Sequence, residues 1–180
     1  MKSFFLKTAS LSALIMVTCM MVNGQANSNY SAIRNANIQI KGSLHNEPLA
    51  WASETVAITV NKQTGEFKAS ILVDDLYFAT PNEKFKGASE ENKGKYLTLS
   101  GTIPVDDVLA NTNNAIDRKV EMTANFNDID YLTPFTFTIL KMPGGFSVMA
   151  NGTISIGALQ IENLSDLDDE LVIILSFTGY

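Results

Sequence analysis

The chain has almost no cysteine and almost no histidine, and this scarcity excludes several kinds of chemistry. One cysteine, Cys19, and one histidine, His45, occur in 180 residues. A catalytic triad or dyad with an imidazole base would have to use His45, which we expect in an exposed turn between two early strands. A zinc site lacks its usual ligands for the same reason. We therefore predict no catalytic residue, no metal site and no cofactor.

The first 26 residues have the layout of a secretory signal peptide. Lys2 and Lys7 precede an apolar run, and the small residues Gly24 and Ala26 follow it. The run has about a dozen residues, whereas a membrane-spanning helix needs roughly 20. We expect residues 1–26 to be a cleaved leader, with cleavage after Gly24 or Ala26, and the mature protein to be periplasmic or secreted.

Cys19 leaves one alternative open for this leader. Val17, Thr18 and Cys19 resemble the lipobox of a lipoprotein signal, although Thr18 stands where a smaller residue is expected and the apolar run continues to Val22. We favour cleavage without lipidation. The mature chain then contains no thiol and no disulfide, so its stability must come from burial of side chains.

Positive charge is also scarce. Loss of the leader lowers the number of Lys and Arg residues from 13 to 11 against 19 Asp and Glu, and the net charge from −6 to −8. An acidic surface of this kind disfavours nucleic acids and anionic membranes. We predict one domain, residues 27–180, with no nucleic-acid partner and no membrane span. The sequence does not indicate a protein partner.

From residue 37 onward, apolar and polar residues alternate with a period of two, which predicts β-strands. Gly101 interrupts one run and predicts a bulge or a bend. The last run, residues 171–177, is apolar on both faces, as in a strand that is covered on both sides. The clearest runs are residues 56–60, 67–73, 97–103, 120–126, 135–139, 146–150 and 154–156.

Turn-forming residues separate these runs and complete the fold prediction. Residues 61–65, 81–82, 143–145 and 151–152 have the composition of turns, and residues 82–95 that of a long loop. Helix is restricted to one or two turns that begin at Pro104. We predict an all-β protein, either a sandwich or an antiparallel β-barrel of about eight strands, with at most one or two short helices.

Acidic pairs are the remaining candidates for a metal site. The densest cluster contains Asp166, Asp168, Asp169 and Glu170. Calcium prefers several oxygen ligands, but no cluster has the Asp-x-Asp-x-Asp-Gly spacing with a distal glutamate. Acidic residues at strand ends are ordinarily solvated turns. We therefore predict no metal here, with calcium at this cluster as the alternative.

Large apolar side chains occupy one face of the predicted strands. A barrel of about eight strands has an interior that is either filled by such side chains or wide enough for one slender ligand. The pattern is compatible with both outcomes. The residues that we predict to face the interior, and to touch a ligand if one is bound, are Phe67, Leu97, Leu99, Met122, Phe135, Phe137, Phe146 and Ile173.

Five segments resemble the YceI-like family of exported proteins, in which a lipocalin-like barrel holds a long-chain isoprenoid or a similar amphiphile. Residues 56–67 resemble the early hairpin of that family, with its Thr-Gly-Glu turn, and residues 74–78 its acidic segment with aromatic residues. Residues 96–103 are similar to its central strand, and residues 154–165 and 168–177 to its final strands. The resemblance implies a lipocalin-like barrel and an apolar, lipid-like ligand.

Three functional hypotheses follow from the sequence. The first is an exported, non-catalytic protein that binds a long-chain lipid or an isoprenoid-like amphiphile. The second is a structural or protein-interaction β-sandwich of the cell envelope, with the loop at residues 82–95 as its contact surface. The third, a secreted hydrolase, has the least support, because the chain offers so few nucleophiles and bases.

Overall fold

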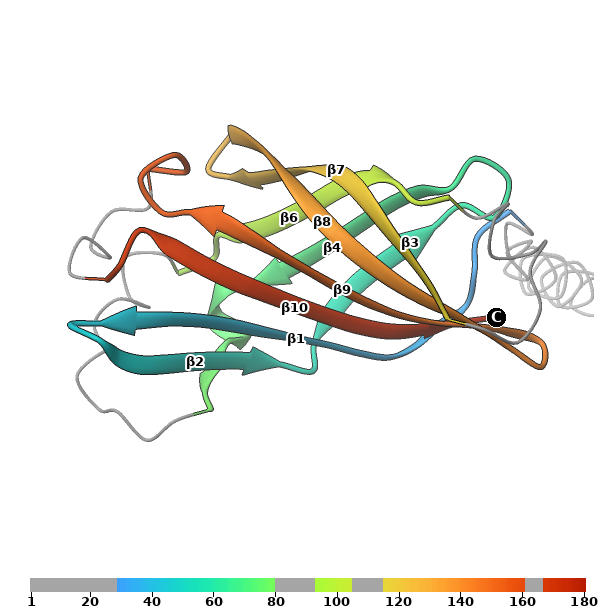
Figure 1. Cartoon of the computed structure of the whole chain (residues 1–180), viewed down its shortest axis with the longest axis horizontal. Helices are drawn as coiled ribbons and strands as arrows, with labels where there is room; N and C mark the ends of the chain where they lie inside the picture. Colours follow the sequence, from blue (N-terminus) through green and yellow to red (C-terminus); the bar gives the residue numbers. More distant parts are fainter. Residues whose placement is uncertain (1–28, 80–92, 105–114, 161–166) are drawn as a thin grey trace, which may run out of the picture.

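The computed structural model describes residues 29–79, 93–104, 115–160 and 167–180, in which the chain forms one antiparallel sheet of ten strands. The strands follow the order β3-β4-β6-β7-β8-β9-β10-β1-β2-β5, and the sheet curls on itself (Figure 1). The predicted leader lies outside the described residues. The strands are β1 (Ile33–Leu44), β2 (Glu47–Ser53), β3 (Val56–Val60), β4 (Glu66–Leu72), β5 (Tyr77–Phe78), β6 (Tyr96–Thr102), β7 (Ile116–Phe126), β8 (Ile129–Met142), β9 (Gly145–Ser155) and β10 (Glu170–Gly179).

The segment that precedes β1 reaches across to β3, the strand at one end of the strand order. The Ser31 amide donates to the Val60 carbonyl over 2.9 Å, and the Lys62 amide donates to the Asn29 carbonyl over 2.7 Å. The edge strand β3 is therefore covered at its C-terminal end, which shortens the open edge of the sheet. Exposed edges recruit other strands, so covering part of β3 reduces the edge that is open to such pairing.

Two-residue turns connect two of the long hairpins. His45 and Asn46 join β1 to β2 with φ values of 50° and 69°, and Asn127 and Asp128 join β7 to β8 with 51° and 62°. Positive φ at both positions is the conformation of a type I′ turn, whose twist matches that of the strands on either side. His45 is exposed, as predicted.

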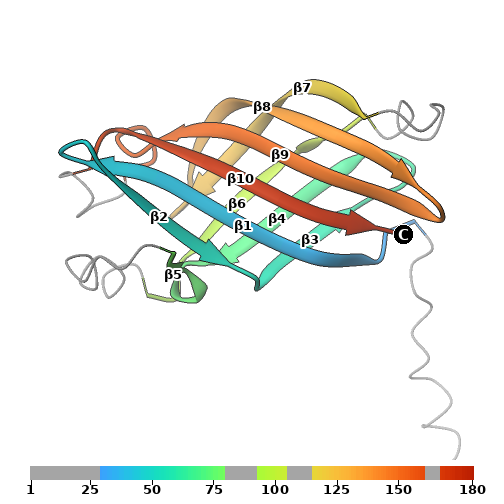
Figure 2. The same ribbon diagram turned by 60° about the horizontal axis from the view of Figure 1, so that its bottom comes forward.

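The core fills the inner face of the curled sheet. Figure 2 shows β9, β10 and β1 next to one another, with β3, β4 and β6 across the interior from them. The ring of Phe67 in β4 stacks on the ring of Phe177 in β10, with 5.9 Å between centroids, so the two walls are in contact through their side chains. Inward residues are buried along most of each long strand, with half-buried ones in the first half of β7 and at the ends of β1, and the outward residues are exposed or half-buried.

The predicted all-β barrel is confirmed, with ten strands in place of about eight. One addition is β5, a two-residue strand that pairs with β2. It follows a single 3-10 turn at Val73–Asp75, the one short helix in the described residues. No described helix has the length and apolar character that crossing a membrane requires. The predicted helical turn from Pro104 and most of the predicted loop at residues 82–95 lie outside the described residues.

The turn predicted at residues 151–152 and the bulge predicted at Gly101 are wrong. Asn151 and Gly152 lie inside β9, where Gly152 pairs with Phe135 and a Cβ at Gly152 would lie 2.5 Å from the Phe135 ring. The glycine therefore makes room for an aromatic ring across the ladder instead of turning the chain. At Gly101 the pairing of β6 with β4 continues without a register shift. The bulge lies in β1, between Arg34 and Asn37.

The final strand is also less covered than its composition predicts. Ile173 and Leu175 in β10 are buried, as expected for its inner face. Val172, on the outer face, is 40% exposed. An apolar residue on an outer strand face does not by itself require a covering element, because much of any protein surface is apolar.

Candidate functional site

The barrel interior contains all eight residues that were predicted to face it. Each of these side chains is buried, and all belong to one continuous core cluster. They come from β4, β6, β7, β8, β9 and β10, so the period-two pattern identified the inner face of six different strands. Their contact with a ligand stays a prediction. The eight are Phe67, Leu97, Leu99, Met122, Phe135, Phe137, Phe146 and Ile173.

Four phenylalanines are packed together in this interior. Phe67 meets Phe137 edge to face with 5.8 Å between ring centroids, and it stacks on Phe177. Phe177 in turn meets Phe146 edge to face at 6.4 Å. Phe177 lies two residues before the C-terminal Gly179 of β10, and Phe146 follows directly on the β8–β9 turn. The aromatic cluster therefore fills the end of the barrel that carries the C-terminus.

Small residues occupy other interior positions. Ala69 in β4, Ala124 in β7 and Ala150 in β9 are fully buried. Ala69 and Ala124 both pair with Leu99, one on each side of β6. Alternation of large and small inward residues is the usual means by which small barrels fit their interior. These alanines are the places where added volume would project into the interior.

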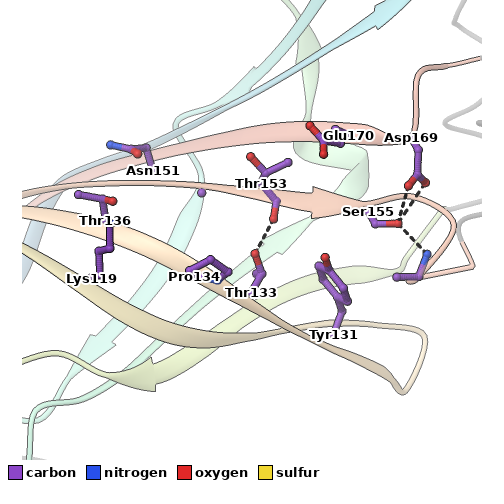
Figure 3. A pocket seen from close by; sticks show the side chains of 12 residues that line it. Lys119, Tyr131, Thr133, Pro134, Thr136, Asn151, Thr153, Ser155, Asp169 and Glu170 are labelled. Atoms are coloured by element: carbon purple, nitrogen blue, oxygen red, sulfur yellow. Dashed lines mark hydrogen bonds between the residues drawn. The ribbon is translucent and has the colours of Figure 1, made fainter.

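A second candidate site is a cleft in the wall of the barrel, on the outer side of β8 and β9 (Figure 3). It has a volume of about 620 Å³, and its lining is mixed, with polar side chains, one proline and one tyrosine. β7, β8, β9, β10 and the segment between β9 and β10 all contribute. The lining residues are Lys119, Tyr131, Thr133, Pro134, Thr136, Asn151, Gly152, Thr153, Ser155, Ala158, Asp169 and Glu170.

The cleft exists because the β8–β9 ladder stops early. Pairing runs from Met142–Gly145 to Phe135–Gly152 and then ends. The next pair in this register would be Pro134 with Thr153, and a proline has no amide hydrogen to donate. The Thr153 carbonyl instead accepts a hydrogen bond from the hydroxyl of the buried Thr133 over 2.6 Å. Beyond this point β8 pairs only with β7, and β9 only with β10.

One end of the cleft is formed by a carboxylate that holds the start of the β9–β10 connection. Asp169 accepts hydrogen bonds from the Gly157 amide at 2.7 Å and from the Ser155 hydroxyl at 2.9 Å. These two donors, the backbone amide first, hold the pKa of Asp169 below its ordinary value. Next to it, Asp168 is hydrogen-bonded to Ser43 at the end of β1.

Aspartates outside this cluster are likewise engaged in hydrogen bonds. Asp74 accepts from the Gly94 amide, and Asp130 accepts from the Asn125 side chain at 2.7 Å. Asp166 lies outside the described residues. Among the described residues, no three His, Cys, Asp or Glu side chains lie close enough to hold a metal ion. The carboxylates of this region therefore act as turn and loop acceptors.

Comparisons with known proteins agree with the fold. No family model and no curated protein matches the chain. Its structure is similar to that of a polyisoprenoid binding domain from Saccharophagus degradans implicated in plant cell wall breakdown, with a TM-score of 0.65, 10% identity, and coverage of 84% of this chain and 97% of that one. It is also similar to BcnA from Burkholderia cenocepacia, with a TM-score of 0.57, 12% identity, and coverage of 81% and 96%. The resemblance drawn from the sequence is thereby confirmed at the level of the fold, a lipocalin-like barrel.

Proposed function

We propose that this chain is an exported, non-catalytic binding protein that holds a long-chain lipid or an isoprenoid-like amphiphile inside its barrel. The observation that carries the proposal is the continuous apolar inner face of a curled sheet whose fold is shared with a polyisoprenoid binding domain. The leader predicted at residues 1–26 supports export. The scarcity of histidine and cysteine supports a binding role without catalysis.

The aromatic cluster limits where a chain can lie. Four phenylalanines are in ring contact at the end of the barrel that carries the C-terminus, namely Phe67, Phe137, Phe146 and Phe177. The ligand would therefore occupy the opposite end of the barrel interior. There the inward residues are mainly aliphatic. Each methylene group that leaves water contributes about 0.8 kcal/mol before ordering costs. A chain of ten or more carbons would then be bound firmly without any polar anchor.

Fluorescence titration with a polyene fatty acid tests this proposal. The inward variant Ala124→Leu adds volume beside Leu99, and we expect it to weaken binding at least tenfold. The outward variant Thr123→Leu adds comparable bulk on the other face of the same strand and serves as the matched control. Equal affinities in the two variants, or no binding to the wild type, would contradict a ligand in the interior.

The same variant separates a binding protein from a purely structural module. If the interior is a filled core, Ala124→Leu overpacks it and lowers the free energy of unfolding by about 1–3 kcal/mol. A barrel with room for a chain accommodates the leucine, with little change in stability. Urea denaturation of the ligand-free variant therefore favours one of the two functions directly.

A further inference from the structure

We propose that the cleft between β8 and β9 is a binding site for a neutral, hydroxyl-rich ring such as a sugar, separate from the interior of the barrel. The cleft has an independent structural origin, the early end of the β8–β9 ladder at Pro134. Its volume is about 620 Å³. The cleft extends ~13 Å along β9, from Asn151 to Ser155, which is the length of one or two sugar rings.

The chemistry of the lining favours a polyol over an ion. Lys119 lies at one end, and Asp169 and Glu170 lie at the other, so neither sign of charge dominates. An anion would meet the two carboxylates, on a protein of net negative charge, and a cation would meet the lysine. A neutral ligand with both donors and acceptors avoids these penalties and can hydrogen-bond to groups of each kind.

The cleft also offers flat apolar surfaces beside its polar groups. Pro134 is exposed, and the half-buried Tyr131 packs on the core with one side. Figure 3 shows the Tyr131 ring rising from β8 next to Thr133 and below Ser155. The C–H face of a sugar ring packs on surfaces of this kind, while its hydroxyl groups stay at the polar rim.

Polar groups along the rim are available to such a ligand. Lys119 pairs across the sheet with Thr136, and Thr136 with Asn151, so an ammonium, a hydroxyl and an amide form one row. Within the described residues, Lys119, Thr136 and Asn151 make no hydrogen bond or ion pair through their side chains. Both donors and acceptors in this row are therefore free to meet a ligand.

The sugar ring has two possible sources, a free saccharide and the headgroup of a glycosylated amphiphile. Three sets of probes separate them in NMR titrations of the full chain. The first is a panel of glucose, galactose, N-acetylglucosamine and cellobiose. The second is octyl glucoside below its micelle concentration, and the third is octanol, which has the chain without the sugar.

We expect the amide resonances of residues 133, 135, 136 and 151–155 to shift with a sugar-bearing probe. Asn151→Ala should weaken that binding about tenfold, the loss of one hydrogen bond of about 1.4 kcal/mol. Ser147→Ala, on the same outer face of β9 but outside the cleft, is the matched control and should leave the affinity unchanged. Shifts with the free sugars assign the site to a saccharide, and shifts with octyl glucoside alone assign it to a headgroup.

Two results would overturn the proposal. One is the absence of shifts in the cleft with all sugar-bearing probes. The other is an equal response to octanol, which would mean that the cleft reports chain binding in the interior. The first result leaves the fatty-acid titration untouched, and the second would itself be evidence of chain binding in the interior, so this proposal can fail while the proposed function stands.

Discussion

The pairing of Gly152 with Phe135 gives a prediction that tests the packing of the interior. In Gly152→Ala, the new Cβ would lie 2.5 to 2.7 Å from three atoms of the Phe135 ring. Carbon atoms pack at roughly 3.5–4.0 Å, so the ring would have to retreat by about 1 Å. Phe135 is almost completely buried, and overpacking of this kind costs about 1–3 kcal/mol. Against this, alanine is about 0.5–1 kcal/mol better than glycine within a strand.

We therefore expect Gly152→Ala to lower the free energy of unfolding by about 1–2 kcal/mol, measured by urea denaturation. In a Phe135→Leu background the ring is gone, and the same substitution should be neutral or stabilising. The cycle of four proteins should give a coupling energy of about 1–3 kcal/mol. An equal effect of Gly152→Ala in both backgrounds would mean that the ring does not lie over Gly152 and would refute the reasoning.

Three other variants test separate parts of the structure. Thr133→Val removes the hydroxyl that donates to the Thr153 carbonyl at the end of the β8–β9 ladder. We expect the free energy of unfolding in urea to fall by about 1–3 kcal/mol. No loss of stability would mean that water replaces the hydroxyl. Gly65→Ala and Gly144→Ala both place alanine at positive φ, 72° and 79°, but only the first also meets a backbone carbonyl, that of Ile103. We expect Gly144→Ala to lower the free energy of unfolding by about 1–2 kcal/mol through backbone strain, and Gly65→Ala to lower it clearly more. Similar losses in the two variants would contradict the position of the loop that contains Gly65. Because the pKa of Asp169 is lowered in the folded state, its contribution to stability is present above the ordinary pKa of 3.8 and is lost as the pH falls through the folded-state pKa. Asp169→Asn should therefore lose less stability than the wild type between about pH 6 and about pH 3, and an identical pH dependence would contradict the hydrogen bonds of this carboxylate.

The inner face of the barrel was predictable because it follows from a local rule. Successive side chains in a strand point to opposite faces, so one large apolar residue at every second position identifies the buried side. Phe135 and Phe137 in β8 and Phe146 in β9 were found in this way, and all are buried. Residues 61–65 were also predictable as a turn, and the Asn61 side chain accepts from the Gln63 and Thr64 amides there.

Features that depend on partners far along the chain were not predictable. Asn-Gly is among the strongest local signals for a hairpin, yet at residues 151–152 the pairing of Gly152 with Phe135 keeps the chain extended. The wall cleft was missed for a related reason. Pro134 ends the ladder only because the register places it opposite Thr153, and that register is set by the turn at residues 143–144.

The turn at Asn127 and Asp128 was missed although the sequence carries a local signal for it, because both residue types tolerate positive φ.

The central claim, that the barrel holds an apolar chain, is tested most directly by native mass spectrometry of the protein purified from its own host without detergent. The account predicts a mass above that of the polypeptide, and organic extraction of the same sample should recover a long-chain amphiphile in near-equal molar amount. The Ala124→Leu variant should retain much less of this material than Thr123→Leu. A wild-type protein that is folded and consistently has the mass of the bare polypeptide would contradict the claim.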